Sequence, residues 1–428
     1  MASPAFSDPT SSPSSTFFGA MIAFVLLLVA FATCCCAGAP HSLETLLVSS
    51  YNDGNETSGF VRALRAAKVN HDSWDLTTVF SDPTSCGRSP SWLTLDERRG
   101  ILYCLDEGLD TPNGSINTFK ITQGRHGKIE PADNKETVSG PVSAVLYGPK
   151  HKQFLVAAHY TGSAVTTWET KKDGGIEYGE VFDFEMDAPG PDPDRQDAPH
   201  PHQAILDPTG KFILIPDLGA DLVRVYSFDG KTGDLTAQSP LVAKPGSGPR
   251  HGAFFTWKSK QCKKGCTNFY LVSELENTVT TYSVAYGKGG NLTFTETAVI
   301  STFGDGPTPD GAAAAEILVS PDHRFVTVSN RNDTSFAIPE GANVQLKSDS
   351  LATFSIKSDG SLKFENLASA AGSFPRAISF NKKGNMVAVA HQYSKSLVLL
   401  DRNPITGFIG GELARMNDLG NLTSVVWG

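Results

Sequence analysis

The chain has 428 residues, of which 40% are hydrophobic and 19% are charged, and its formal net charge is −9. This composition supports a large buried core and excludes a disordered acidic tail. An acidic chain without a Lys- and Arg-rich run has little to neutralise a phosphate backbone, which excludes a typical nucleic-acid-binding protein. The 40 Gly and 26 Pro residues favour short strands joined by turns over long helices.

The first predicted element is a targeting segment. Residues 17–39 form an uncharged apolar run that ends in the small residues Ala37, Gly38 and Ala39. This pattern predicts a signal peptide over residues 1–39, and therefore a secreted protein with no membrane attachment after cleavage. The run is also long enough to span a bilayer, and no Lys or Arg precedes it, so a membrane-tethered form held by an uncleaved signal anchor is the alternative.

Cysteines and sequons agree with export. Without the signal peptide four cysteines are left, Cys86, Cys104, Cys262 and Cys266, and an even count in an exported chain predicts two disulfides. Pairing Cys86 with Cys104 and Cys262 with Cys266 closes short loops, although the other two connectivities stay open. A zinc site on the Cys262–Cys266 spacing is the competing interpretation. Five N-x-S/T sequons predict surface glycans, at Asn55, Asn113, Asn291, Asn332 and Asn421.

A short apolar strand that ends in a polar residue recurs at intervals of about 53 to 61 residues. Its copies are LLVSSYND from Leu46, ILYCLDEG from Ile101, FLVAAHYT from Phe154, FILIPDLG from Phe212, FYLVSELE from Phe269, FVTVSNRN from Phe325 and MVAVAHQY from Met386. Another strand precedes most copies, starting at Pro90, Pro141, Pro201, Ala314 and Pro375. A third strand of alternating character follows most copies, which predicts a repeated β-meander.

The two ends of the chain complete one unit. The first copy lacks its opening strand, and a matching strand, TSVVWG, stands at the C-terminus from Thr423 to Gly428. A chain whose last strand completes its first unit closes a ring and leaves no exposed sheet edge. The sequence therefore predicts an all-β protein, with a single seven-bladed β-propeller domain over residues 40–428. An open β-solenoid is the alternative fold.

In a propeller, equivalent residues of the blades form rings. The residue that ends the second strand of each unit is always polar: Tyr51, Asp106, His159, Asp217, Glu274, Asn330 and His391. The second residue of the first strand forms another column, Ser91, Val142, His202, Arg250, Ala315 and Arg376, with His251 and Glu316 one position further on. Asp106, Asp217 and Asn330 are interpreted as caps of turns, and His159 and His391 as structural.

The arginines are harder to explain structurally. Arg250, Arg331 and Arg376 each lie beside a strand that should be buried, and a buried guanidinium needs a partner. Glu274 and His202 are the natural companions. Such groups at one channel mouth indicate a pocket that binds and polarises an anionic substrate. The catalytic candidates are His202, Arg250, Glu274 and Arg331, and the substrate-binding candidates are His200, His251 and Arg376. Calcium on Asp106, Asp217 and Glu274 is conceivable, but no segment clusters carboxylates and we predict no metal.

Four segments carry a resemblance to a known family. PHPHQAILDPTGKFILIPDLGADLVRVY, GSGPRHGAFF followed by LVSELENTV, AEILVSPDHRFVTVSNRND and FPRAISFNKKGNMVAVAHQYS resemble the signatures of the lactonase family of seven-bladed propellers. That family includes bacterial 6-phosphogluconolactonase and fungal carboxy-cis,cis-muconate cyclase. The resemblance implies an active site in the central channel, built from His202, Arg250, Glu274 and Arg331, with no metal or organic cofactor. It implies that the arginines bind anionic oxygens while Glu274 and His202 move a proton or activate water.

The expected function is therefore lactone processing. The enzyme would hydrolyse a lactone such as 6-phosphogluconolactone or form one by cycloisomerisation of a carboxy-muconate. Its partner would be a small anionic lactone or dicarboxylate, and we expect a monomer. The predicted export departs from the intracellular members of the family. The alternative is thus a non-catalytic secreted propeller that binds a ligand at the cell surface or wall.

Overall fold

The computed structural model describes residues 43–428 except 53–59, 71–72, 84, 123–127, 259–261, 264 and 341–343. The predicted signal peptide over residues 1–39 and the sequon at Asn55 lie outside the described residues. Leu43–Gly428 form one compact unit. The described part of this unit is all-β and contains no helix long and apolar enough to cross a membrane.

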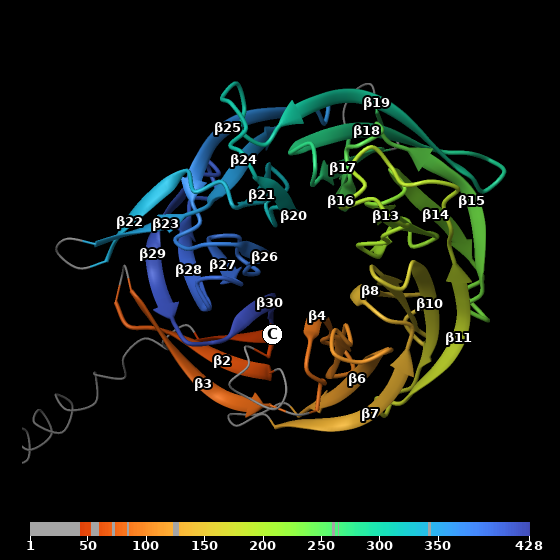
Figure 1. Cartoon of the computed structure of the whole chain (residues 1–428), viewed down its shortest axis with the longest axis horizontal. Helices are drawn as coiled ribbons and strands as arrows, with labels where there is room; N and C mark the ends of the chain where they lie inside the picture. Colours follow the sequence, from red (N-terminus) through yellow and green to blue (C-terminus); the bar gives the residue numbers. More distant parts are fainter. Residues whose placement is uncertain are drawn as a thin grey trace, which may run out of the picture. The chain divides into compact units, whose positions relative to one another are not determined.

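Seven four-stranded antiparallel sheets form the blades of a propeller (Figure 1). Blade 1 contains β30 (Asn421–Trp427), β1 (Leu43–Tyr51), β2 (Phe60–Lys68) and β3 (Trp74–Asp82). Blade 2 contains β4 (Pro90–Asp96), β5 (Ile101–Asp106), β6 (Gly114–Ile121) and β7 (Ile129–Thr137). Blade 3 contains β8 (Pro141–Tyr147), β9 (Phe154–His159), β10 (Ala164–Thr170) and β11 (Ile176–Asp183). Blade 4 contains β12 (Ile205–Leu206), β13 (Phe212–Asp217), β14 (Leu222–Phe228) and β15 (Leu235–Val242).

The remaining three blades follow the same order of strands. Blade 5 contains β16 (Pro249–Trp257), β17 (Cys266–Ser273), β18 (Thr278–Tyr286) and β19 (Leu292–Ser301). Blade 6 contains β20 (Ala313–Val319), β21 (Phe325–Arg331), β24 (Ser350–Ile356) and β25 (Leu362–Ser369). An unpredicted hairpin of β22 (Phe336–Glu340) and β23 (Val344–Ser348) is inserted between β21 and β24. Blade 7 contains β26 (Pro375–Phe380), β27 (Met386–His391), β28 (Ser396–Arg402) and β29 (Ile409–Met416).

The recurring apolar strand is the second strand of each blade. It is buried along its length because both faces of every sheet pack against neighbouring blades; Phe154–His159 and Met386–His391 are buried at every position. One core cluster, for example, joins Ile101 and Tyr103 of β5 to Leu155 and Ala157 of β9. The fourth strands lie at the outer rim (Figure 1), where many residues are exposed, as in β7 and β11. Continuous burial explains why the second strands stand out in the sequence.

The chain closes as predicted. β30 pairs with β1 through Val48↔Val425 and Leu46↔Trp427, and β30 contacts the neighbouring first strands β26 and β4. Closure pairs the edge of β1 that would otherwise be open. The closing strand starts at Asn421, two residues before the predicted start.

β-Bulges occur at the predicted inner column. Ser91, Val142, Arg250 and Arg376 are each the extra residue in the pairing of the first two strands of their blades. In blade 6, Ala315 and Glu316 together lie opposite Ser329. A bulge interrupts the ladder and re-aims a side chain, which is why bulges are frequent beside active sites.

Blade 4 corrects one predicted element. The strand expected from Pro201 is reduced to β12 at Ile205–Leu206, and Pro201 forms only an isolated bridge with Asp217. Pro201 pairs with Asp217 as Pro90 pairs with Asp106 in blade 2, and the His202 N–H donates to the Pro216 carbonyl over 2.8 Å, but the regular ladder begins only at Ile205. His202 consequently lies in an irregular stretch before β12.

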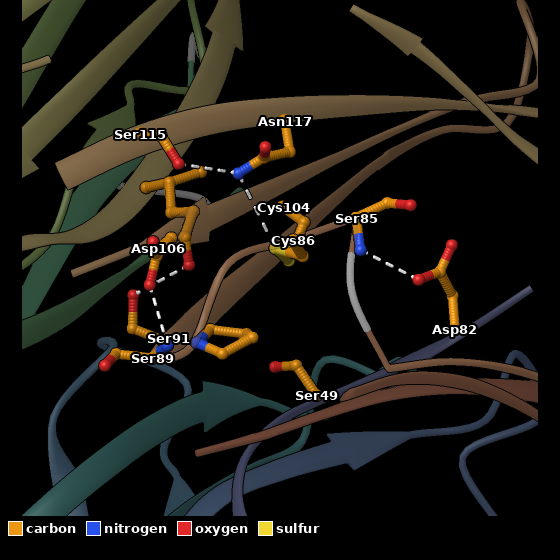
Figure 2. The surroundings of a disulfide bond; sticks show 12 residues. Ser49, Asp82, Ser85, Cys86, Ser89, Ser91, Cys104, Asp106, Ser115 and Asn117 are labelled. Atoms are coloured by element: carbon orange, nitrogen blue, oxygen red, sulfur yellow. Dashed lines mark hydrogen bonds between the residues drawn. A yellow bond between two sulfur atoms is a disulfide. The ribbon is translucent and has the colours of Figure 1, made fainter. Parts of the chain in front are cut away.

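Two disulfides are present, Cys86–Cys104 and Cys262–Cys266, so the zinc interpretation is wrong because all four thiols are consumed. Figure 2 shows the first, which ties the segment before β4 to the buried strand β5. Beside it the Ser89 N–H donates to Asp106 Oδ1 over 2.7 Å. Asp106 thus has the structural turn-capping role predicted for it.

The sequons in the described part differ in exposure. The side chains of Asn113, Asn291 and Asn332 are exposed, whereas Asn421 is half-buried at the start of β30. Glycosylation itself stays a prediction.

Candidate functional site

Glu274 lies at the centre of a cluster of three arginines. It follows the last residue of β17, while Arg250 is in the β16 bulge and Arg331 ends β21. Glu274 Oε2 is 2.9 Å from Arg250 Nε and 2.6 Å from Arg331 Nη2. Arg195, in the long connection between β11 and β12, donates from Nη2 to Glu274 Oε1 over 2.6 Å. Segments of three blades therefore meet at one carboxylate.

The arginines keep Glu274 ionised despite its burial. Only 2% of Glu274 is exposed. Burial alone would raise its pKa, but Arg331, Arg250 and Arg195 together lower the pKa of Glu274 to about 2. Such a carboxylate is a weak base at neutral pH. It is better suited to hold the guanidinium groups in place than to accept a proton from substrate or water.

The cluster carries excess positive charge and free donors. Three guanidinium groups face one carboxylate, and Arg250, 2% exposed, has no hydrogen-bond partner for Nη1 among the described residues. Arg250 Nε and Arg331 Nη2 reach Glu274 at ion-pair distance but without hydrogen-bond geometry. Burial and the nearby Arg331 lower the pKa of Arg250 to about 9, so it is still cationic at pH 7. Unpaired buried N–H groups with excess charge form an anion site.

A pocket of about 540 Å³ opens onto this cluster. Arg195, Glu274 and Arg331 line it together with Phe374 and Tyr393, among other residues. The Arg331 guanidinium lies 5.0 Å from the centre of the Phe374 ring, a cation–π contact that orients it. Asp192 also lines the pocket, which therefore combines an apolar wall with two arginines and two carboxylates.

A second group of buried side chains extends from His202. His202 Nδ1 is 3.1 Å from His251 Nε2, and His251 Nδ1 is 3.0 Å from Glu316 Oε1. Trp92 and Tyr160 pack edge-on against His251 and His202. Burial, followed by the positive charges of Arg250, His251, Arg376 and Arg331, holds the pKa of His202 well below its usual range. His202 is therefore a neutral base at pH 7, within electrostatic reach of the arginine cluster.

Arg376 belongs to a third group. Its Nη2 donates to Glu107 Oε1 over 3.2 Å, and the Tyr51 hydroxyl donates to the same oxygen. Burial raises the pKa of Glu107, although Arg376 and Tyr51 oppose this effect. Because Arg376 also lowers the pKa of His202, this group and the arginine cluster act on the same imidazole. The two predicted rings thus come within reach of each other.

Other predicted residues are engaged elsewhere. His200 uses both ring nitrogens, with 2.9 Å between Nδ1 and the Tyr160 carbonyl and 2.9 Å between Nε2 and Asp197 Oδ1. Its substrate-binding role stays a prediction. Asp217, as expected for a cap, accepts from the His200 N–H and from Arg224. His159 and His391 are fully buried and bonded within their own surroundings, which agrees with the structural interpretation.

Three polar residues of the site escaped the sequence analysis. Glu107 directly follows Asp106, and Tyr160 directly follows His159. Comparing the next position of each repeat as well would therefore have found both. Arg195 lies in the connection over 184–204, which has no equivalent in the other blades, so no column contains it. Within the described residues no cluster of three or more His, Cys, Asp or Glu side chains is arranged to hold a metal ion.

Known proteins resemble this chain over most of its length. A family model described as "Lactonase, 7-bladed beta-propeller" matches residues 45–427. The chain belongs to this lactonase family. One lactonase relative, "Probable 6-phosphogluconolactonase" of Arthroderma benhamiae, is 30% identical over 347 residues, covering 81% of this chain and 82% of that protein. The 6-phosphogluconolactonase of Bacillus subtilis is 27% identical over 343 residues, covering 78% and 88%.

A solved structure shares the lactonase fold. The periplasmic gluconolactonase PpgL of Pseudomonas aeruginosa superposes with a TM-score of 0.72 at 23% identity, covering 90% of this chain and 99% of that chain. At this identity the likeness supports the fold alone. The predicted family and the seven-bladed architecture are therefore confirmed, and the lactonase relatives favour an enzyme over the binding propeller.

Proposed function

We propose that this protein is an exported lactonase that hydrolyses the ring ester of a small anionic sugar lactone such as 6-phosphogluconolactone. The observation that carries the proposal is the unpaired N–H of buried Arg250, whose positive charge also acts on the neutral His202. The relatives named 6-phosphogluconolactonase support the hydrolytic direction. The two disulfides support export.

The residues divide the chemistry between them. His202 accepts a proton from a water molecule that attacks the lactone carbonyl carbon. Arg250 and Arg331 bind the carbonyl oxygen as it becomes negative, and Glu274 holds both guanidinium groups in place. The ring C–O bond then breaks, the leaving oxygen takes the proton from His202, and the hydroxy acid product ionises. One proton is thus released to solvent for each ring opened.

Arg376, beside Glu107 and Tyr51, binds polar groups of the substrate. A phosphate or carboxylate of the substrate would add an ionic contact to the arginine cluster, in which three guanidinium groups face Glu274. Phosphorylated lactones are therefore expected to react with a lower KM than their unphosphorylated counterparts.

The test measures proton release at constant pH with purified protein and a panel of lactones. The panel contains 6-phosphogluconolactone, gluconolactone and carboxymuconolactone, with spontaneous hydrolysis subtracted. We expect acceleration of the phosphorylated lactone, and a loss of at least about 100-fold in His202→Gln. His159→Gln is the matched control, because His159 is also a buried histidine and its ring nitrogens contact the Val138 carbonyl and the Thr166 hydroxyl.

Two results would contradict the proposal. Equal rates for His202→Gln and the wild-type protein would remove His202 from the reaction. Failure to open any lactone, together with saturable binding of one in calorimetry, would favour the non-catalytic binding propeller.

A further inference from the structure

Glu316 is a buried carboxylate that the proposed reaction leaves unused. It lies in the β20 bulge, where Ala315 and Glu316 share one partner residue, and it is 3% exposed. Its backbone N–H donates to the hydroxyl of Ser329 over 3.1 Å. A buried carboxylate needs a partner, and the bulge aims this one at His251 on the neighbouring blade.

The hydrogen bonds between Glu316, His251 and His202 have a direction. A carboxylate can only accept, so His251 Nδ1 must carry a proton and donate to Glu316 Oε1. In the neutral ring His251 Nε2 is then an acceptor, and His202 Nδ1 must carry the proton between them. This leaves His202 Nε2 without a proton. It also has no hydrogen-bond partner among the described residues, which makes it a free lone pair.

The opposite direction requires a protonated Glu316 and fits the surroundings less well. The Ile317 N–H donates to the same Oε1 over 3.2 Å, which favours an oxygen with both lone pairs available. The positive charge of Arg250 interacts electrostatically with Glu316. Trp92 against His251 and Tyr160 against His202 hold the two rings in the required orientations.

We infer that Glu316 and His251 are positioning residues which hold His202 in the tautomer with an unprotonated Nε2, the form required of the general base. The inference rests on the proposed function. When His202 takes a proton at Nε2, it becomes an imidazolium whose charge Glu316 stabilises through His251. No proton needs to move along the relay, and the proton on Nε2 passes to the leaving oxygen.

The first test reads the tautomers directly. Nitrogen-15 NMR of histidine-labelled protein at pH 7 distinguishes protonated from unprotonated ring nitrogens, and His202→Gln and His251→Gln assign the signals. We expect a protonated Nδ1 and an unprotonated Nε2 for His202. In Glu316→Gln we expect a mixture of tautomers. The control Asp207→Asn alters another buried carboxylate, which caps the turn before β13, and should leave the tautomers of His202 unchanged.

The second test is a double-mutant cycle on lactone hydrolysis. We expect Glu316→Gln to lower kcat at least about tenfold with KM within twofold, and to have no further effect in the His202→Gln background. Additive losses, or a KM effect alone, would overturn the inference.

The two tests separate the inference from the proposed function. A protonated Nε2 on His202 in the wild-type protein overturns the relay whether or not any lactone is hydrolysed. The expected tautomers in a protein that opens no lactone support the relay as a structural device and reject the lactonase proposal.

Discussion

The stability of the arginine cluster should depend on pH through Glu274. The ordinary pKa of a glutamate is 4.5, and in the folded protein Arg331, Arg250 and Arg195 outweigh burial and lower the pKa of Glu274 to about 2. The difference corresponds to about 3 kcal/mol of folding free energy at neutral pH. Because the folded pKa is the lower one, this stabilisation is present above about pH 4.5 and is lost as pH falls towards 2.

The perturbation is Glu274→Gln, which keeps the shape of the side chain and removes its charge. The free energy of unfolding in urea is measured for both proteins at pH 7, 4.5 and 3. The wild-type protein should be more stable by about 3 kcal/mol at pH 7, and this difference should shrink by about 2 kcal/mol at pH 3. The control is Glu276→Gln, which removes a half-buried carboxylate paired with exposed Lys244 and should cost less than about 1 kcal/mol.

A difference that stays constant from pH 7 to pH 3 would refute the reasoning. It would mean that Glu274 has the same pKa in the folded and unfolded chains, and that the three guanidinium groups do not act on it. A variant as stable as the wild-type protein at pH 7 would contradict the argument in the same way.

Three further predictions follow from the fold and the site. Because the pKa of His202 is lowered, kcat/KM for a lactone should fall to half only at a pH well below 6.5, and half-loss near 6.5 would show an ordinary histidine. Replacing Cys86 and Cys104 by Ser should lower the free energy of unfolding in urea by about 3 kcal/mol, since the bond joins residues 18 positions apart; a loss below about 1 kcal/mol would contradict this. Deleting residues 421–428 removes three buried apolar side chains of β30, about 2 kcal/mol each, and reopens the edge of β1. Circular dichroism and size-exclusion chromatography should then find no folded monomer.

The fold was largely predictable because each blade contains one fully buried strand, and these strands appear in the sequence as regularly spaced apolar runs. The second strand of each blade is covered on both faces by the neighbouring blades. The same apolar run therefore recurs along the chain, from the copy at Leu46 to the copy at Met386. The exchange of the terminal strand was visible for the same reason. Departures came in blade 4, where the regular ladder begins only at Ile205, and in blade 6, where a hairpin, β22–β23, was inserted.

The composition of the site was predictable only in part. The second residue of each first strand, which includes Arg250 and Arg376, coincides with the bulges. The polar residues at this position therefore indicated a site in the channel. Arg195 was not predictable because it lies outside the repeat. The roles of these residues could not be predicted from the alignment of the repeats. Glu274 and His159 occupy equivalent positions, but Glu274 is surrounded by arginines, whereas His159 is bonded to Thr166 of its own blade.

The amino-acid sequence was sufficient to establish the seven blades, the closure of the ring and the kinds of polar residue that line its inner columns. These features depend on local periodicity, which a single chain displays in order. Only the tertiary structure decided which polar groups are free to act. Hydrogen-bond direction at His202, the ionisation of Glu274 and the unpaired N–H of Arg250 each depend on distances between groups from different blades. These distances between groups of different blades cannot be read from sequence spacing, because they depend on the closure of the ring and on the side-chain orientations that the bulges produce.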